Sequence, residues 1–126
     1  MYNILVCDDE KDIVEALGIY LSAEGYQVTK AYNGQEACEK LKTEDVQLVL
    51  MDIMMPVMDG LEATRRIRSM NRRDAMTIPI VAMSANAFQE DVEKSLAAGL
   101  NEYLTKPLDE KKLTETMKKY LGKKMR

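Results

Sequence analysis

The sequence of 126 residues contains no histidine. This absence excludes histidine-based acid and base catalysis, Ser-His-Asp triads and zinc sites with histidine ligands. No apolar run approaches the roughly 20 residues that a membrane-spanning helix needs. No basic leader followed by an apolar segment opens the chain. We therefore expect a cytoplasmic protein with no membrane association.

Cysteine is scarce, and the two cysteines form no CxxC motif. Cys7 lies in an apolar run, and Cys38 lies on the apolar stripe of an expected helix. Cysteines in such positions are more typical of small buried hydrophobic side chains than of a disulfide. We expect both thiols to be free, with a disulfide as the alternative.

The composition is that of one globular domain, with 46% apolar and 31% charged residues. The net charge of −3 argues against non-specific binding of nucleic acid. We find no internal repeat and no linker. Residues 1–122 are expected to form the domain, and residues 123–126 a C-terminal tail or the root of a linker.

Strand-like apolar runs alternate with helical patterns along the chain. Strands are expected at residues 3–7, 26–31, 46–51, 78–83 and 102–105. Helical spacing of apolar residues follows each strand, and the last two helices are marked by Phe88, Val92 and Leu96 and by Leu113, Met117, Tyr120 and Leu121. Asn33-Gly34 is expected to form a turn. This (βα)5 pattern predicts an α/β fold with a parallel five-stranded sheet and helices on both faces.

Charged residues follow three of the expected strands. Asp8 and Asp9 end the first strand, Asp52 ends the third, and Lys106 follows the fifth. Because ligands of open α/β sheets bind at the carboxyl ends of the strands, we expect these groups to share one crevice. Oxygen ligands without histidine or cysteine favour Mg²⁺ or Mn²⁺, and the lysine suits a phosphoryl group.

A simpler interpretation exists for the first acidic turn. Acidic residues often cap helices after a strand, so Asp9 or Glu10 could serve only as an N-cap. That interpretation does not account for Asp52 and Lys106 at the ends of two other strands.

Four segments carry a resemblance to a known family. They are residues 6–10 (VCDDE), 51–60 (MDIMMPVMDG), 80–85 (IVAMSA) and 99–107 (GLNEYLTKP). In this order the chain resembles the receiver domain of two-component response regulators over nearly its whole length. The resemblance implies a flavodoxin-like fold with strand order 2-1-3-4-5.

The resemblance also implies roles for individual residues. Asp52 would accept a phosphoryl group from a phosphohistidine. Asp8, Asp9 and Asp52, with the backbone carbonyl of Met54, would bind Mg²⁺, or alternatively Mn²⁺. Lys106 would contact a phosphoryl oxygen, and its bond to Pro107 is expected to be cis.

The remaining implied residues concern switching and the lifetime of the phosphoryl group. Ser84 would contact the phosphoryl group, and Tyr103 would change its exposure to solvent on switching. Without the resemblance, we would interpret Ser84 as a helix cap and Tyr103 as a half-buried residue of an edge strand. Ala85 would leave room for the phosphoryl group. Met54 and Asn86 would set the rate of hydrolysis.

The expected function is phosphorelay signalling rather than metabolic catalysis. The domain would catalyse its own phosphorylation and dephosphorylation. Its expected partners are a histidine kinase or histidine phosphotransfer domain as donor and a downstream effector protein or domain, with no direct contact with nucleic acid. The segment around Ser84 resembles receivers of hybrid kinases or single-domain receivers.

Three points stay open at this stage. A pseudo-receiver that only binds partners is one alternative, although no site residue is missing. An aspartate-nucleophile phosphatase is another, but Met54 stands where such enzymes carry a second aspartate. A homodimer through the fourth helix, fifth strand and fifth helix is compatible with their charges, whereas Asn101 replaces the aspartate of dimerising receivers.

Arginines are concentrated around the third helix. They are Arg65, Arg66, Arg68, Arg72 and Arg73. We interpret them as a solvated face, with docking of an acidic partner as the alternative.

Overall fold

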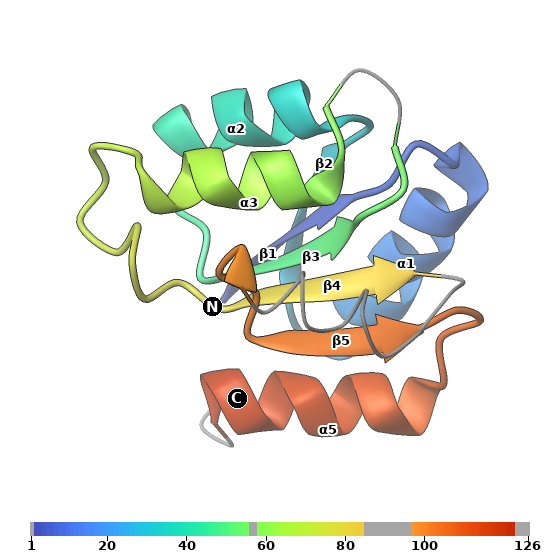
Figure 1. Ribbon diagram of the computed structural model, residues 1–126. Coiled ribbons are helices and arrows are strands. Elements are labelled where there is room, and N and C mark those ends of the chain that lie inside the picture. The colour runs from blue at the N-terminus through green and yellow to red at the C-terminus, as the bar shows by residue number, and fades with distance from the viewer. Residues whose placement is uncertain (1, 56–57, 85–96, 123–126) are drawn as a thin grey trace.

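The computed structural model describes residues 2–55, 58–84 and 97–122. These residues form a parallel five-stranded sheet in the order β2-β1-β3-β4-β5 (Figure 1). The strands are β1 (Asn3–Cys7), β2 (Gln27–Ala31), β3 (Leu48–Asp52), β4 (Ile80–Ser84) and β5 (Glu102–Thr105). The fold class and the strand order expected from the sequence are confirmed.

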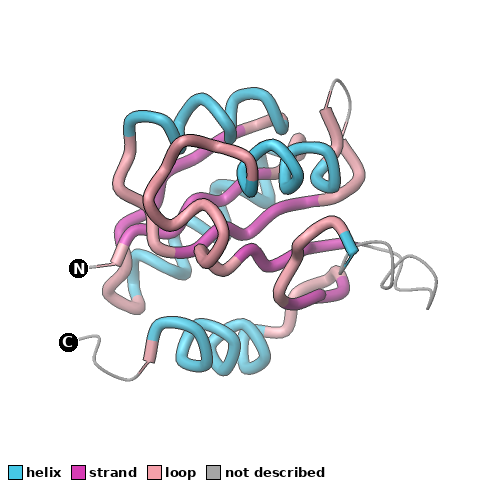
Figure 2. The backbone as a smooth tube through the Cα atoms, turned by 60° about the vertical axis from the view of Figure 1, so that its left-hand side comes forward, coloured by secondary structure: helices cyan, strands magenta, loops and turns pink. Residues whose placement is uncertain are grey.

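Helices cover both faces of the sheet. They are α1 (Lys11–Ala23), α2 (Gly34–Thr43), α3 (Gly60–Arg68) and α5 (Glu110–Leu121). Helices α2 and α3 lie on one face and α1 and α5 on the other, and Figure 2 shows the strands running between these two layers. The helix expected around Phe88, Val92 and Leu96 lies outside the described residues.

The sheet separates two hydrophobic clusters. Leu5 and Cys7 of β1 pack toward α2 and α3, whereas Ile4 and Val6 pack toward α1 and α5. This alternation follows from the two-residue period of a strand. Because every residue of β1, β3 and β4 is buried, the ends of these strands are fixed by packing on both faces.

Helix α2 begins with reciprocal capping. The Glu36 N–H donates to Asn33 Oδ1 at 2.8 Å, and Glu36 Oε1 accepts a hydrogen bond from the Tyr32 N–H at 2.8 Å. The pattern resembles a capping box. The chain turns from β2 into α2 at this point, with Asn33 as the N-cap and Gly34 as the first helical residue.

Two of the arginines around α3 are structural, which corrects the interpretation of this cluster as a solvated face. The Arg68 guanidinium donates to the carbonyl oxygens of Ile78 and Gly99, both at 2.7 Å. Arg72 donates to the carbonyls of Leu41 at 2.9 Å and Val46 at 2.5 Å. These bonds give partners to carbonyls in the last turn of α2 and in the segments that precede β3, β4 and β5.

The other arginines differ in this respect. Arg65 and Arg66 pair with Glu62 on the exposed surface of α3, as a solvated face predicts.

Within the described ranges, no helix has the length and apolar character needed to cross a membrane.

We predict that Arg72→Ala lowers the free energy of unfolding by roughly 2–3 kcal/mol, because buried carbonyls lose a charged donor. The matched control is Arg73→Ala, since Arg73 is the exposed neighbour. Its effect should stay within about 0.5 kcal/mol. Urea unfolding followed by circular dichroism measures both. Equal losses in the two variants would contradict the structural role of Arg72.

Candidate functional site

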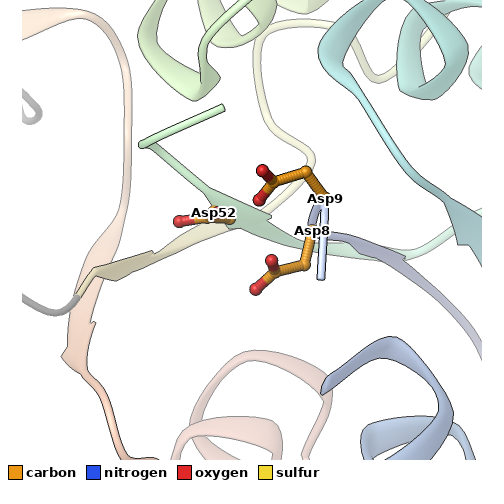
Figure 3. Close-up of side chains that lie close together, drawn as sticks. All are labelled: Asp8, Asp9 and Asp52. Atoms are coloured by element: carbon orange, nitrogen blue, oxygen red, sulfur yellow. The ribbon is translucent and has the colours of Figure 1, made fainter. Parts of the chain in front are cut away.

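The candidate site lies at the carboxyl edge of the sheet. Asp8 and Asp9 directly follow β1, Asp52 is the last residue of β3, and Lys106 directly follows β5. Figure 3 shows the three aspartate side chains projecting into one space from the ends of β1 and β3. The structure therefore brings together the four charged residues predicted from the sequence.

The three carboxylates lie close together. One oxygen from each of Asp8, Asp9 and Asp52 falls within 4.8 Å of the others. Asp8 is fully buried and Asp52 is 2% exposed, whereas Asp9 is exposed. Two of the charges are thus withdrawn from water, which strengthens their mutual repulsion.

Lys106 is the cation at the centre of this cluster. Its Nζ lies 2.7 Å from Asp8 Oδ2 and 3.6 Å from Asp52 Oδ1. The exposed Glu10 carboxylate lies 3.7 Å away on the solvent side. Burial by itself lowers the pKa of Lys106, but the hydrogen bond that Lys106 donates to Asp8 and the charges of Asp52, Asp8 and Glu10 outweigh it and raise the pKa. Lys106 therefore stays protonated.

The environment of Asp52 makes its negative charge unfavourable. Its burial and the charge of Asp8 raise its pKa to about 7. The Met54 N–H, which donates to Asp52 Oδ1 at 3.2 Å, and the Lys106 charge oppose this rise. The site thus carries more negative charge than its lysine neutralises.

This donor set fits a hard divalent cation. The site offers carboxylate oxygens, and no histidine exists in the chain to favour a softer metal. A bound cation would offset the burial and the repulsion from Asp8 that raise the pKa of Asp52. Asp8, Asp9 and Asp52 are the residues that could hold the ion.

The β3–α3 loop, described at residues 53–55 and 58–59, carries Met54 beside Asp52. Met54 is 70% exposed, whereas Met55 is 8% exposed and packs in the core. The loop ends at Gly60, where an added Cβ would lie 2.7 Å from Ile53 Cα. Because α3 approaches the end of β3 this closely, glycine is required there.

The structure describes some of the predicted switch and loop residues but not all of them. Ser84 is buried at the end of β4, and its carbonyl accepts the Lys106 N–H at 2.8 Å. Tyr103 is half-buried on β5, and the Lys106-Pro107 peptide bond is cis, as expected. The predicted residues Ala85 and Asn86 lie outside the described residues.

Comparison with known proteins identifies the family. A model of the response regulator receiver domain matches residues 4–118. The chain belongs to this family. Receiver domains are components of two-component signalling, which agrees with the resemblance found in the sequence.

Relatives of this receiver domain differ in length. An uncharacterised 14.6 kDa protein of Leptolyngbya boryana is 39% identical over 94% of this chain and 88% of its own length. The response regulator SaeR of Staphylococcus epidermidis is 34% identical over 90% of this chain, which spans 47% of that regulator. The chain thus resembles both a protein of similar size and one part of a longer regulator.

A solved receiver domain has the same fold. The receiver domain of the sensor histidine kinase PA1611 from Pseudomonas aeruginosa has a TM-score of 0.87 and is 34% identical. The match covers 96% of this chain and 98% of that one. That structure has a magnesium ion coordinated in its active-site cleft.

Sequence reasoning did not find the supporting residues beneath the site. The Cys7 S–H donates to the Asn33 carbonyl at 3.2 Å, and burial together with the charges of Asp8 and Asp52 raises the Cys7 pKa, so that it stays a thiol. The expectation of two free cysteines is confirmed. Met55 is buried against Cys7. Only the apolar character of residues 53–55 signalled this packing.

We predict that Asp52→Asn stabilises the metal-free protein above neutral pH. The folded state raises the pKa of Asp52 from 3.8 to about 7, so it binds this proton more tightly than the unfolded state. The contribution of Asp52 to stability is therefore present at low pH and is lost as the pH rises toward 7. At about pH 8 the free energy of unfolding of Asp52→Asn should exceed that of the wild type by roughly 1–3 kcal/mol. At about pH 4 the two free energies of unfolding should differ little.

Urea unfolding in EDTA across this pH range measures the difference. Glu39→Gln, on the exposed surface of α2, is the matched control for loss of one negative charge. A pH-independent difference between wild type and Asp52→Asn would refute the raised pKa.

Proposed function

We propose that this domain accepts a phosphoryl group from a phosphohistidine donor onto Asp52 in a Mg²⁺-dependent reaction. The carrying observation is the buried Asp52 carboxylate, which lies with two other carboxylates and with Lys106 Nζ 3.6 Å away. Family membership supports the assignment. The donor would be a histidine kinase or a histidine phosphotransfer domain, and the output a protein–protein contact.

Asp8, Asp9 and Asp52, with the backbone carbonyl of Met54, are the proposed ligands of Mg²⁺. The excess of negative charge among the carboxylates supports this assignment. When bound, the cation would supply positive charge for the phosphoryl oxygens. The magnesium in the PA1611 receiver domain supports the choice of metal, and Mn²⁺ is an alternative with similar ligand preferences.

The nucleophile of the proposed transfer is a carboxylate oxygen of Asp52. It forms a bond to phosphorus while the phosphorus–nitrogen bond of the donor breaks, and the electron pair stays on the imidazole nitrogen. The product is an acyl phosphate on Asp52 and a neutral imidazole. Lys106, already charged and held by Asp8 at 2.7 Å, would pair with a phosphoryl oxygen.

The acyl phosphate would be removed by water. Attack of water on phosphorus breaks the bond to the Asp52 oxygen and regenerates the carboxylate and inorganic phosphate. Met54, 70% exposed beside Asp52, and Asn86 are the proposed determinants of water access. Ala85 would provide space for the phosphoryl group, and Pro107 would fix the backbone beside Lys106.

Ser84 and Tyr103 are the proposed switch. The Ser84 hydroxyl would move toward the phosphoryl group, and Tyr103 on β5 would change its exposure. Ser84 pairs with Thr105 in the register of β4 and β5, and Tyr103 lies two residues earlier on β5. The neighbouring strands support coupling between the two residues through the backbone of β5. The proposed output surface consists of strand β5, helix α5 and the expected fourth helix, whose residues lie outside the described ranges.

We predict that acetyl phosphate with Mg²⁺ adds one phosphoryl group to the wild type, since acetyl phosphate supplies a small phosphoryl donor. Asp52→Asn lacks the nucleophile and should gain none, and EDTA should abolish the adduct on the wild type. Intact-mass spectrometry measures all three. An adduct that persists on Asp52→Asn would mean that another residue is the acceptor.

The same experiment separates the alternative functions. A wild type that gains no phosphoryl group from acetyl phosphate or from a phosphohistidine donor would favour a pseudo-receiver. Multiple-turnover release of phosphate from unrelated phosphomonoesters would favour a phosphatase.

We predict that Ser84→Ala is still phosphorylated but switches less, because the nucleophile remains while the hydroxyl that contacts the phosphoryl group is lost. Amide hydrogen exchange of residues 100–105, compared before and after phosphorylation, measures the switch. Thr29→Ala, on the opposite edge strand β2, is the control. A full phosphorylation-dependent change in Ser84→Ala would exclude Ser84 as the switch residue.

A further inference from the structure

The β2–α2 turn, defined here as Tyr32, Asn33 and Gly34, contacts the end of β1. The Asn33 carbonyl accepts the Cys7 S–H at 3.2 Å. One residue before the turn, the Ala31 carbonyl accepts the Asp8 N–H at 3.2 Å. The backbone that carries Asp8 is thus held by the end of β2 and by this turn.

The same turn contacts the β3–α3 loop from its other side. A Cβ added at Gly34 would lie 2.5 Å from the Met58 carbonyl oxygen and 3.0 Å from Met58 Cγ. Beneath the loop, Met55 Sδ lies 3.7 Å from Cys7 Sγ. The loop that follows Asp52 therefore packs against both the turn and the end of β1.

The turn has little freedom to move. Its backbone is tied to helix α2 by the two bonds between Glu36 and residues Tyr32 and Asn33. Gly34 itself is buried. If a larger side chain at position 34 pushed the two segments apart, the β3–α3 loop would consequently move and the turn would stay in place.

We propose that the β2–α2 turn is a positioning element of the site, and that Gly34 and Met55 set the distance between the β3–α3 loop and the aspartates after β1. The inference rests on the proposed function, because it assigns these residues to the placement of Asp52 and the Met54 carbonyl. Neither Gly34 nor Met55 contacts a reacting atom. They act through the backbone of the loop.

The expected consequence of Gly34→Ala is a shifted loop in a folded protein. The added Cβ meets a backbone oxygen, which cannot rotate away as a side chain can. Because displacements of about 1 Å can reduce a rate by about a hundredfold, a smaller shift should lower the phosphorylation rate about tenfold. The dissociation constant for Mg²⁺ should rise by a similar factor.

Two matched pairs of variants test the proposal. Gly18→Ala is the control for Gly34→Ala, because the nearest atom to an added Cβ in the middle of α1 is the flexible end of Lys30, at 3.2 Å, and Val28 Cγ1 follows at an ordinary contact distance of 3.9 Å. Met55→Ala opens space beneath the loop, and Met55→Leu refills it with a side chain of similar volume. Urea unfolding establishes that each variant is folded under the assay conditions.

The readouts are the Mg²⁺ dissociation constant from calorimetry with the metal alone and the rate of phosphorylation by acetyl phosphate. The proposal expects Gly34→Ala and Met55→Ala to be impaired in both, with Gly18→Ala and Met55→Leu close to wild type. Wild-type values in folded Gly34→Ala and Met55→Ala would overturn it. If Gly34→Ala does not fold, the Met55 pair decides by the same criterion.

The two proposals fail in different ways. Absence of phosphorylation in the wild type would refute the proposed function, and the Mg²⁺ affinities of the four variants would still decide the role of the turn. Normal phosphorylation in all four variants, with unchanged Mg²⁺ affinity, would refute the positioning role and leave the proposed function intact.

Discussion

The concentration of negative charge at one edge of the sheet is the constraint on which the rest of the structure depends. Three carboxylates meet there, two of them buried, and Lys106 is the cation that pairs with them. Such an arrangement opposes folding, as the raised pKa of Asp52 indicates. The fully buried strands β1 and β3 hold the aspartates in place, because moving either end would disturb packing on both faces of the sheet.

The loops at this edge are positioned mainly by contacts without charge. Gly60 brings the start of α3 against the backbone at the end of β3, and Gly34 brings the β2–α2 turn against Met58. Buried Met55 fills the space between the loop and Cys7. Apolar packing tolerates little displacement, so it can maintain a repulsive arrangement of charges that electrostatics alone would separate.

The fold and the charged site could be predicted from the sequence because both depend on local patterns. Alternating strands and helices require a parallel sheet, and the charges that follow β1, β3 and β5 must then meet at one edge. The roles of Arg68 and Arg72 could not be predicted, because some of the carbonyls to which they donate, those of Gly99 and Leu41, lie more than twenty residues away in the sequence. An arginine at the end of an amphipathic helix has the same pattern whether it faces water or a carbonyl.

The Asn33-Gly34 pair shows why the supporting residues of the site were harder to find than its aspartates. The dipeptide is typical of a turn, and nothing in its sequence indicates that Gly34 lies against Met58, which is distant in the sequence. Electrostatic energies between buried charges vary steeply with distance, so a glycine that sets a backbone separation can influence the carboxylates without touching them. The conformational freedom of Gly34 is then secondary, and the absence of its side chain is what the site requires.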